Sequence, residues 1–116
     1  MFVYRIEHKT ERIGPYTDTE DGYGIGYEFR DEIAVGEEHP APWEDGLDHC
    51  TYAYYCGFSS KAQMQAWFKP HHIEWFEKND YYVYRYVVNP QYVEHGCKQC
   101  MFKRDCALIR FKTTYH

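Results

Sequence analysis

Hydrophobic and polar residues alternate over three stretches of the chain, and such alternation is typical of β-strands. In the first stretch, residues 2–7, every second side chain beginning with Phe2 is expected to face the core. Residues 81–88 carry apolar side chains on both sides, which predicts a strand at the centre of a sheet. Residues 106–112 predict the last strand.

Between residues 59 and 79 the apolar period lengthens to that of a helix. Ser60, followed three residues later by a glutamine, forms a capping-box pattern that predicts a helix start. Apolar residues then fall at i, i+3 and i+4 from Met64, which places them on one helix face. Pro70 either breaks this helix or opens a second one as its first residue.

Turn signals dominate the segments between these elements. Glycines within residues 24–29 favour a short strand or a loop over a helix. Residues 36–49 contain several prolines and glycines and predict a long loop, and long loops in compact domains are often functional. Residues 50–58 predict a second strand, and residues 98–103 a further β-like run.

Together these elements predict an α+β fold with a mainly antiparallel sheet and one or two short helices, at about residues 59–79, packed on it. At 116 residues the chain is long enough for one domain and too short for two, so residues 1–116 are expected to form a single domain. Aromatic residues make up 20% of the chain, with 13 tyrosines, so the core must be aromatic. Buried tyrosines also need hydrogen-bond partners for their phenol oxygens.

Acidic residues outnumber basic ones by 18 to 13, which gives a net charge of −5. This balance argues against a nucleic-acid partner, because phosphate backbones are bound by basic surfaces. No run of about 18 apolar residues predicts a membrane span, and the N-terminus lacks the pattern of a signal peptide. The five cysteines are an odd number and do not make a fully paired disulfide framework, so reduced thiols and a cytoplasmic location are expected.

The loop around Trp43 is the best positive clue to function, because this tryptophan lies among prolines and acidic residues. Tyrosine and tryptophan are enriched in binding hot spots, where they bury much area at small entropic cost. We therefore expect a small acidic protein-binding module that docks on a basic surface of a protein partner, with acidic residues steering the encounter. The alternative is that Trp43 folds back over the core as a lid. The expected partner-binding residues are Trp43, Glu44, Asp45, Asp48, Tyr23 and Tyr27.

Small acidic domains of this kind are frequent among phage and mobile-element proteins that inhibit host machinery. By this analogy, which rests on size and fold class alone, we expect an inhibitor of host machinery rather than an enzyme. No catalytic residue and no cofactor belong to this interpretation.

A zinc-stabilised interaction module is another interpretation. Cys97 and Cys100 have a chelating spacing, and the candidate ligands are His95, Cys97, Cys100 and Cys106. A strand over residues 98–103 would point Cys97 and Cys100 to opposite faces, so separate free thiols remain the alternative.

Several segments resemble small ADP-ribosyltransferase-like domains. Tyr4-Arg5 lies in the first predicted strand, Phe58-Ser59-Ser60 lies at a strand-to-helix junction, and Gln99 precedes the position of the family's catalytic glutamate. The resemblance implies that Arg5, Ser59 and Gln99 converge on a cleft for a nicotinamide dinucleotide. The glutamate signature itself is absent, because Gln99 is followed by Cys100 and Met101. Without the resemblance, Arg5 is a strand residue, Ser59 a helix cap and Gln99 a surface polar residue.

Overall fold

The computed structural model describes residues 1–17, 24–33 and 38–116. Within these residues the chain forms two antiparallel three-stranded sheets, four short α-helices and three 3-10 helices. In chain order the elements are β1 (Phe2–His8), α1 (Ile25–Glu28), α2 (Arg30–Ile33), η1 (Pro42–Glu44), β2 (Tyr55–Gly57), α3 (Lys61–Trp67), α4 (Pro70–Lys78), β3 (Tyr81–Val87), η2 (Pro90–Tyr92), β4 (Val93–His95), β5 (Cys100–Phe102), η3 (Arg104–Cys106) and β6 (Ile109–Thr113). The predicted α+β class, with a mainly antiparallel sheet and short helices between residues 59 and 79, is confirmed.

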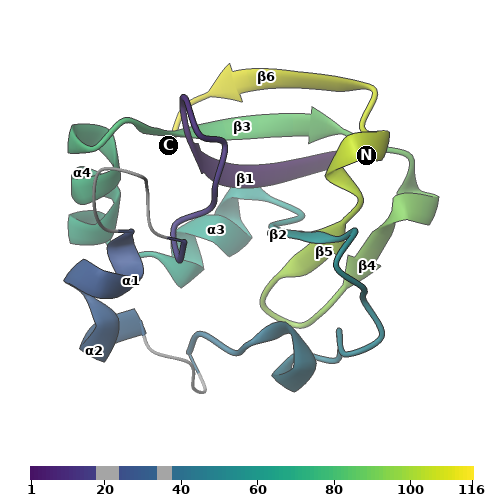
Figure 1. Ribbon diagram of the computed structural model, residues 1–116, viewed down its shortest axis with the longest axis horizontal. Coiled ribbons are helices and arrows are strands. Elements are labelled where there is room, and N and C mark those ends of the chain that lie inside the picture. Colours follow the sequence, from purple (N-terminus) through teal and green to yellow (C-terminus); the bar gives the residue numbers. More distant parts are fainter. Residues whose placement is uncertain (18–23, 34–37) are drawn as a thin grey trace.

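The first sheet has the strand order β1-β3-β6, so β3 is central, as its two apolar faces predicted. β1 pairs with β3 along its whole length, from His8 opposite Tyr81 to Phe2 opposite Val87. β6 pairs with the other side of β3. Figure 1 shows these three long strands running side by side, with α4 at one end of them.

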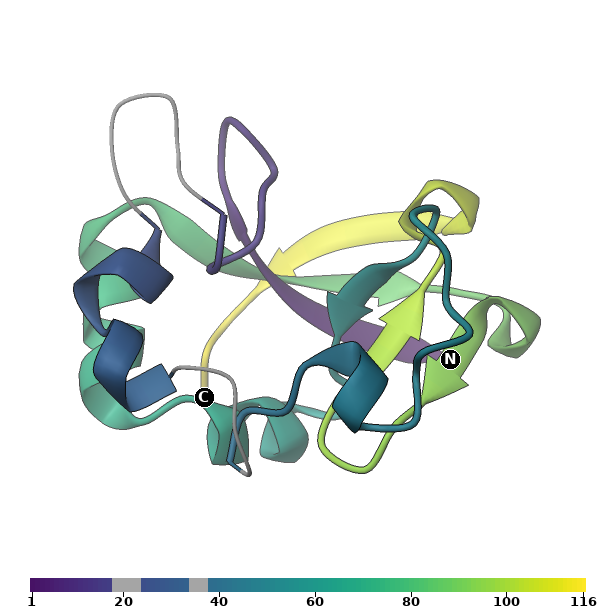
Figure 2. The same ribbon diagram turned by 60° about the horizontal axis from the view of Figure 1, so that its bottom comes forward.

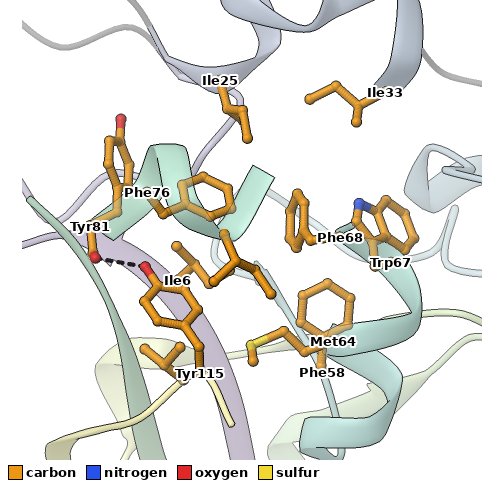
Figure 3. Close-up of a cluster of buried hydrophobic side chains, with 12 residues drawn as sticks. Ile6, Ile25, Ile33, Phe58, Met64, Trp67, Phe68, Phe76, Tyr81 and Tyr115 are labelled. Atoms are coloured by element: carbon orange, nitrogen blue, oxygen red, sulfur yellow. Dashed lines mark hydrogen bonds between the residues drawn. The ribbon is translucent and has the colours of Figure 1, made fainter. Parts of the chain in front are cut away.

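The helices and one face of the first sheet enclose the larger hydrophobic core. α3 begins where the hydroxyl of Ser60 accepts a hydrogen bond from the backbone N–H of Gln63, and α4 begins with Pro70. All three residues of the predicted apolar stripe are buried in this core. Figure 3 shows side chains from the helices and from the sheet meeting there, with the hydroxyl of Tyr115 donating a 2.6 Å hydrogen bond to the backbone oxygen of Tyr81.

The second sheet, in the order β2-β5-β4, packs against the other face of the first sheet through a separate apolar cluster. The two sheets are joined where Tyr4 and Phe58 exchange backbone hydrogen bonds of 2.8 and 2.7 Å. A Cβ atom at the neighbouring Gly57 would collide with the side chain of Val3 and crowd the backbone of Tyr4. The close approach of β2 to β1 therefore requires glycine at this position.

Four local predictions are wrong, in whole or in part. Phe2 was expected to face the core but is 46% exposed, whereas Val3 on the opposite side of β1 is fully buried, because both faces of this strand are covered. Residues 24–29 contain the one-turn helix α1, because burying Ile25 in the core outweighs the helix cost of a glycine. The strand expected over residues 50–58 is confined to β2, and a turn precedes it. The last strand begins at Ile109, since the residues that precede it form η3.

The long loop is confirmed in its described part, residues 38–49, whose single helical turn is η1. Figure 2 shows this segment, coloured blue to teal, passing in front of the second sheet. None of the helices in the described part of the chain has the length and apolar character that crossing a membrane requires.

Candidate functional site

A mostly apolar pocket lies where the long loop, β1 and the end of α3 meet. Its volume is about 280 Å³. Its walls are formed by Arg5, Ile6, Pro15, Tyr16, Ile33, His39, Pro40, Ala41, Pro42, Trp43, Cys56, Phe58, Trp67, Phe68 and Gln99. Pockets for drug-sized ligands span roughly 300–1,000 Å³, so this one has room for a single large side chain or ring system.

Aromatic side chains form much of the pocket wall. Trp67 packs edge-on against Phe58, with ring centroids 5.6 Å apart, and its indole N–H donates a 3.0 Å hydrogen bond to the hydroxyl of Tyr16. Burial raises the pKa of Tyr16 to about 12, so this phenol is neutral at physiological pH. Trp43 also lines the pocket yet is 68% exposed, which places its indole at the rim. The site thus combines a fixed aromatic wall with an exposed tryptophan at its mouth.

Asp45 fixes the loop that carries Trp43 to the turn between β4 and β5. The Asp45 side chain is buried, and its carboxylate accepts hydrogen bonds from three successive backbone N–H groups, those of Cys97 (2.9 Å), Lys98 (3.0 Å) and Gln99 (3.2 Å). Consecutive N–H groups form a concave site that suits an anion, and bonds to a carboxylate are stronger than bonds to a neutral acceptor. Figures 1 and 2 both show the loop and the turn lying side by side.

Two further hydrogen bonds hold the pocket wall in place. The Nε2–H of His39 donates to the backbone oxygen of Trp67 at 2.7 Å, and the side-chain amide of Gln99 donates to the backbone oxygen of Pro40 at 2.7 Å. A side chain at Gly96 would run into the Asp45 carboxylate, so the turn can approach the loop only with glycine there. The pocket is therefore largely preformed.

Arg5 supplies the polar end of the pocket, but hydrogen bonds within the protein already hold it. Its Nε donates to Glu7 at 2.9 Å, and its Nη1 donates to the backbone oxygen of Cys56 at 2.7 Å. Burial raises the pKa of the Cys56 thiol more than the charge of Arg5 lowers it, so this thiol is not an activated nucleophile. The arrangement is suited to binding an apolar group rather than to nucleophilic catalysis.

A group of metal-ligand type in the described part of the chain consists of Glu32, His71 and His72. The Nε2 atoms of the two histidines lie 2.5 and 2.9 Å from the same oxygen of Glu32. The Nδ1 of His72 accepts a hydrogen bond from the backbone N–H of Lys69, so the proton of the neutral ring is on Nε2 and points to Glu32. A metal would need the lone pair of that nitrogen, so these contacts indicate an imidazole–carboxylate pair instead.

A family model described as "Bacteriophage T4 Y00F protein" matches residues 1–114, almost the whole chain. The chain belongs to this phage family. The searches of the curated proteins and of the solved structures gave no match to this chain. Membership in the Y00F family supports the expected phage origin, while the activity has to be inferred from the site.

The predicted partner-binding residues do not form one surface in this Y00F-family protein. Those exposed on the long loop are Trp43, Glu44 and Asp48. Asp45 does not fit the predicted role, because its carboxylate is buried against the backbone of the β4–β5 turn and cannot act as a surface charge. Tyr27 is 57% exposed on α1 and is not part of the pocket wall. Tyr23 lies outside the described residues.

The four predicted zinc ligands do not come together in the Y00F-family structure. Cys100 points into the core from β5, and burial raises its pKa to about 12. The other three are exposed, with Cys97 in the β4–β5 turn, His95 on β4 and Cys106 in η3. None of the five cysteines forms a disulfide bond.

The structure brings together two of the three residues that the ADP-ribosyltransferase resemblance implied. Arg5 and Gln99 line the same pocket, and Gln99 is buried rather than a surface residue. Ser59 lies apart from the pocket wall, where its backbone N–H and hydroxyl meet Oε1 of Gln63 at 2.8 and 3.3 Å. Ser59 therefore has the structural role of a residue at a helix start.

Sequence reasoning missed most of the aromatic pocket wall. The sequence predicts Phe58 at a strand-to-helix junction and Trp67 on the core-facing stripe of a helix, and neither position indicates a pocket. Nothing in the local pattern indicates that the residues before β2 and those after β1 share a cavity. The one available signal was the clustering of prolines around Trp43, which does mark the rim.

Proposed function

We propose that this Y00F-family chain is a protein-binding module whose pocket receives one apolar side chain from a partner with a basic surface. The observation that carries the proposal is the position of Trp43, 68% exposed at the rim of a preformed apolar pocket. An exposed indole next to a pocket of single-side-chain size has the character of a binding hot spot.

The energy available at this rim is sufficient for a specific contact. A tryptophan side chain buries about 150–250 Å² when fully covered, and covering the exposed two-thirds of Trp43 would remove on the order of 130 Å² of largely apolar surface from water. At about 25 cal/mol per Å² this is worth roughly 3 kcal/mol before the entropic cost of association. Because His39 and Asp45 already hold the wall and the loop, little ordering is left to oppose binding.

Charge favours a basic partner. Glu44 and Asp48 are exposed on the same loop as Trp43, and the whole chain carries a net charge of −5. Lysine or arginine side chains next to the apolar anchor would meet these carboxylates at the rim, where they raise the association rate and the specificity more than the affinity.

Four synthetic pentapeptides test both halves of this proposal. Their central residue is tryptophan or alanine, and their four flanking residues are all lysine or all glutamate. We expect the lysine-flanked tryptophan peptide to bind at least about tenfold more tightly than the other three, measured by NMR titration at fixed ionic strength. Trp43→Ala should weaken its binding about tenfold, whereas Tyr52→Ala, which removes a 99% exposed tyrosine outside the pocket wall, should change it less than about twofold.

Two results would contradict the proposal. If the lysine-flanked alanine peptide bound as well as its tryptophan counterpart, only charge would be recognised. If Trp43→Ala bound the tryptophan peptide like the wild type, the pocket rim would not be the binding surface.

The role we propose for this binding is inhibition of a host protein in the host cytoplasm. Expression of the wild-type chain in a host bacterium should then slow growth, and Trp43→Ala should relieve the effect at equal protein level. Equal growth inhibition by the wild type and Trp43→Ala would show that the toxicity does not depend on the pocket, and would contradict the proposed role.

A second candidate function is the binding of a nicotinamide dinucleotide, which the ADP-ribosyltransferase resemblance implies. One observation favours it, namely that Arg5 and Gln99, far apart in the sequence, line the same pocket. At about 280 Å³ the pocket would hold one ring of that ligand rather than all of it. Calorimetry with the oxidised dinucleotide should give a heat of binding that the lysine-flanked tryptophan peptide suppresses, and no heat at millimolar dinucleotide would exclude this function.

A further inference from the structure

Three arginine side chains converge on one buried carboxylate between the two sheets. Glu7 is 0% exposed, and it accepts hydrogen bonds from Nε of Arg5 (2.9 Å), Nη1 of Arg104 (2.8 Å) and Nε and Nη2 of Arg110 (3.3 and 3.2 Å). The hydroxyl of Tyr86 donates a further bond at 2.7 Å. Burial acts to raise the pKa of Glu7, but the bond from Tyr86 and the charge of Arg5 outweigh it and hold that pKa below its usual value. Glu7 is therefore ionised at neutral pH.

The cluster carries more positive than negative charge. Arg12 brings a fourth guanidinium, whose Nη2 lies 3.5 Å from the hydroxyl of Tyr86. The buried Glu7 and the exposed Asp105 are acidic groups that act on it. Among the groups named, the four guanidinium groups exceed the two carboxylates by two positive charges, in a protein whose overall charge is −5. Such an excess creates a local potential that attracts an anion.

The guanidinium groups are held in fixed orientations. Arg104 stacks on the ring of Tyr55 at 3.9 Å, and Arg110 stacks on the ring of Tyr84 at 3.8 Å. Arg104 also donates a 2.9 Å hydrogen bond to the backbone oxygen of Arg12. A guanidinium held by stacking and hydrogen bonds loses little entropy when it binds a ligand.

Several N–H groups of the cluster are still unused. Among the described residues, Nη2 of Arg104 and Nη1 of Arg110 have no hydrogen-bond acceptor. Solvent reaches the cluster, because the side chains of Arg104 and Arg110 are 13% and 29% exposed and Arg12 is exposed. Oriented guanidinium donors of this kind match the oxygens of a phosphate group.

We propose that Arg12, Arg104 and Arg110 form a binding site for a dianionic phosphate group, such as a phosphate monoester. The two excess positive charges match the two charges of a monoester, whereas a phosphodiester carries only one. The site is independent of the proposed protein-binding function, since none of these three arginines lines the pocket beside Trp43.

The test compares phenyl phosphate with dimethyl phosphate in NMR titrations of the whole chain at fixed ionic strength. We expect phenyl phosphate to bind with a Kd below about 5 mM and dimethyl phosphate at least about tenfold more weakly. Arg12→Gln, which loses only one long hydrogen bond of the folded protein, should weaken phenyl phosphate binding at least about fivefold. Arg110→Lys keeps the charge but loses the planar guanidinium and its two hydrogen bonds to Glu7, and it should also weaken phenyl phosphate binding.

Lys112→Gln is the matched control. Lys112 lies on the same strand as Arg110 and stacks on Tyr82, but it makes no contact with Glu7, so its loss should change binding less than about twofold. The proposal is overturned if phenyl phosphate does not bind, if both phosphates bind equally, or if Lys112→Gln weakens binding as much as Arg12→Gln. If Arg110→Lys fails to fold, the comparison of Arg12→Gln with Lys112→Gln still decides.

Discussion

Replacing Asp45 by alanine should destabilise the protein strongly, although sequence alone assigned this residue to a surface. The substitution removes the acceptor of three backbone N–H groups, those of Cys97, Lys98 and Gln99. The bond to Gln99 is buried and the other two are partly buried. Without Asp45 the long loop also loses its main attachment to the β4–β5 turn.

The size of the effect follows from these contacts. A buried N–H that loses its partner costs about 1–3 kcal/mol, and each partly buried one costs less because water can replace the carboxylate. We expect the free energy of unfolding to fall by about 3 kcal/mol. For a domain of this size that loss corresponds to a decrease in Tm of roughly 12 °C. Asp45→Asn keeps one acceptor oxygen and should fall between the wild type and Asp45→Ala.

Thermal and urea unfolding followed by circular dichroism measure this loss. Asp48→Ala is the matched control, because Asp48 is an exposed acidic residue of the same loop and its removal should change stability by less than about 0.5 kcal/mol. A Tm for Asp45→Ala within about 2 °C of that for Asp48→Ala would refute the assigned role of the Asp45 carboxylate.

Three further predictions concern packing, protonation and thiol accessibility. Gly57→Ala should lower the free energy of unfolding in urea by at least about 2 kcal/mol, because its Cβ atom would collide with neighbouring strands. Gly26→Ala is the control, because its Cβ atom would lie at ordinary contact distances within a helix, and it should leave stability unchanged or raise it. Equal changes in stability for the two variants would contradict the packing described for Gly57. Burial lowers the pKa of His72, so as the pH falls below the ordinary histidine pKa of about 6.5 the unfolded chain takes up the proton before the folded protein does. The free energy of unfolding of the wild type should therefore decrease until the pH reaches the lower pKa of the folded state. An equal decrease in His72→Gln would contradict this assignment. In the folded protein iodoacetamide should label the exposed Cys106 and leave the buried Cys100 unmodified until denaturant is added. Mass spectrometry of the peptides measures this difference, and labelling of Cys100 before denaturation would show that β5 does not face the core.

The fold was predictable from sequence where periodicity and capping agree. The sequence predicts β1, β3, α3 and α4 to within a few residues of their observed bounds, because a regular spacing of apolar residues places them on one face that packs against a core. The one-turn helix at Ile25 and the short strand β2 were not predictable, since contacts with distant segments fix them. The division into two sheets depends likewise on the bridge between Tyr4 and Phe58, which no local signal reveals.

The candidate site was predictable only in part, for the same reason. Trp43 stood out because it is an unusual residue in a loop of prolines and acids, and it does lie at the pocket rim. Asp45, two residues later, looks the same in sequence but is buried, because its role depends on backbone groups some 50 residues away. Sequence can thus mark a functional loop while leaving open which of its side chains face outward.

The most direct test of the pocket assignment is the measurement of intermolecular nuclear Overhauser effects in the complex with the lysine-flanked tryptophan peptide. The account predicts contacts from the peptide indole to the ring protons of Phe58 and Trp67, which form the inner wall, and to those of Trp43 at the rim. Contacts from the peptide indole only to aromatic residues outside this wall, such as Tyr27 or Tyr52, would contradict it.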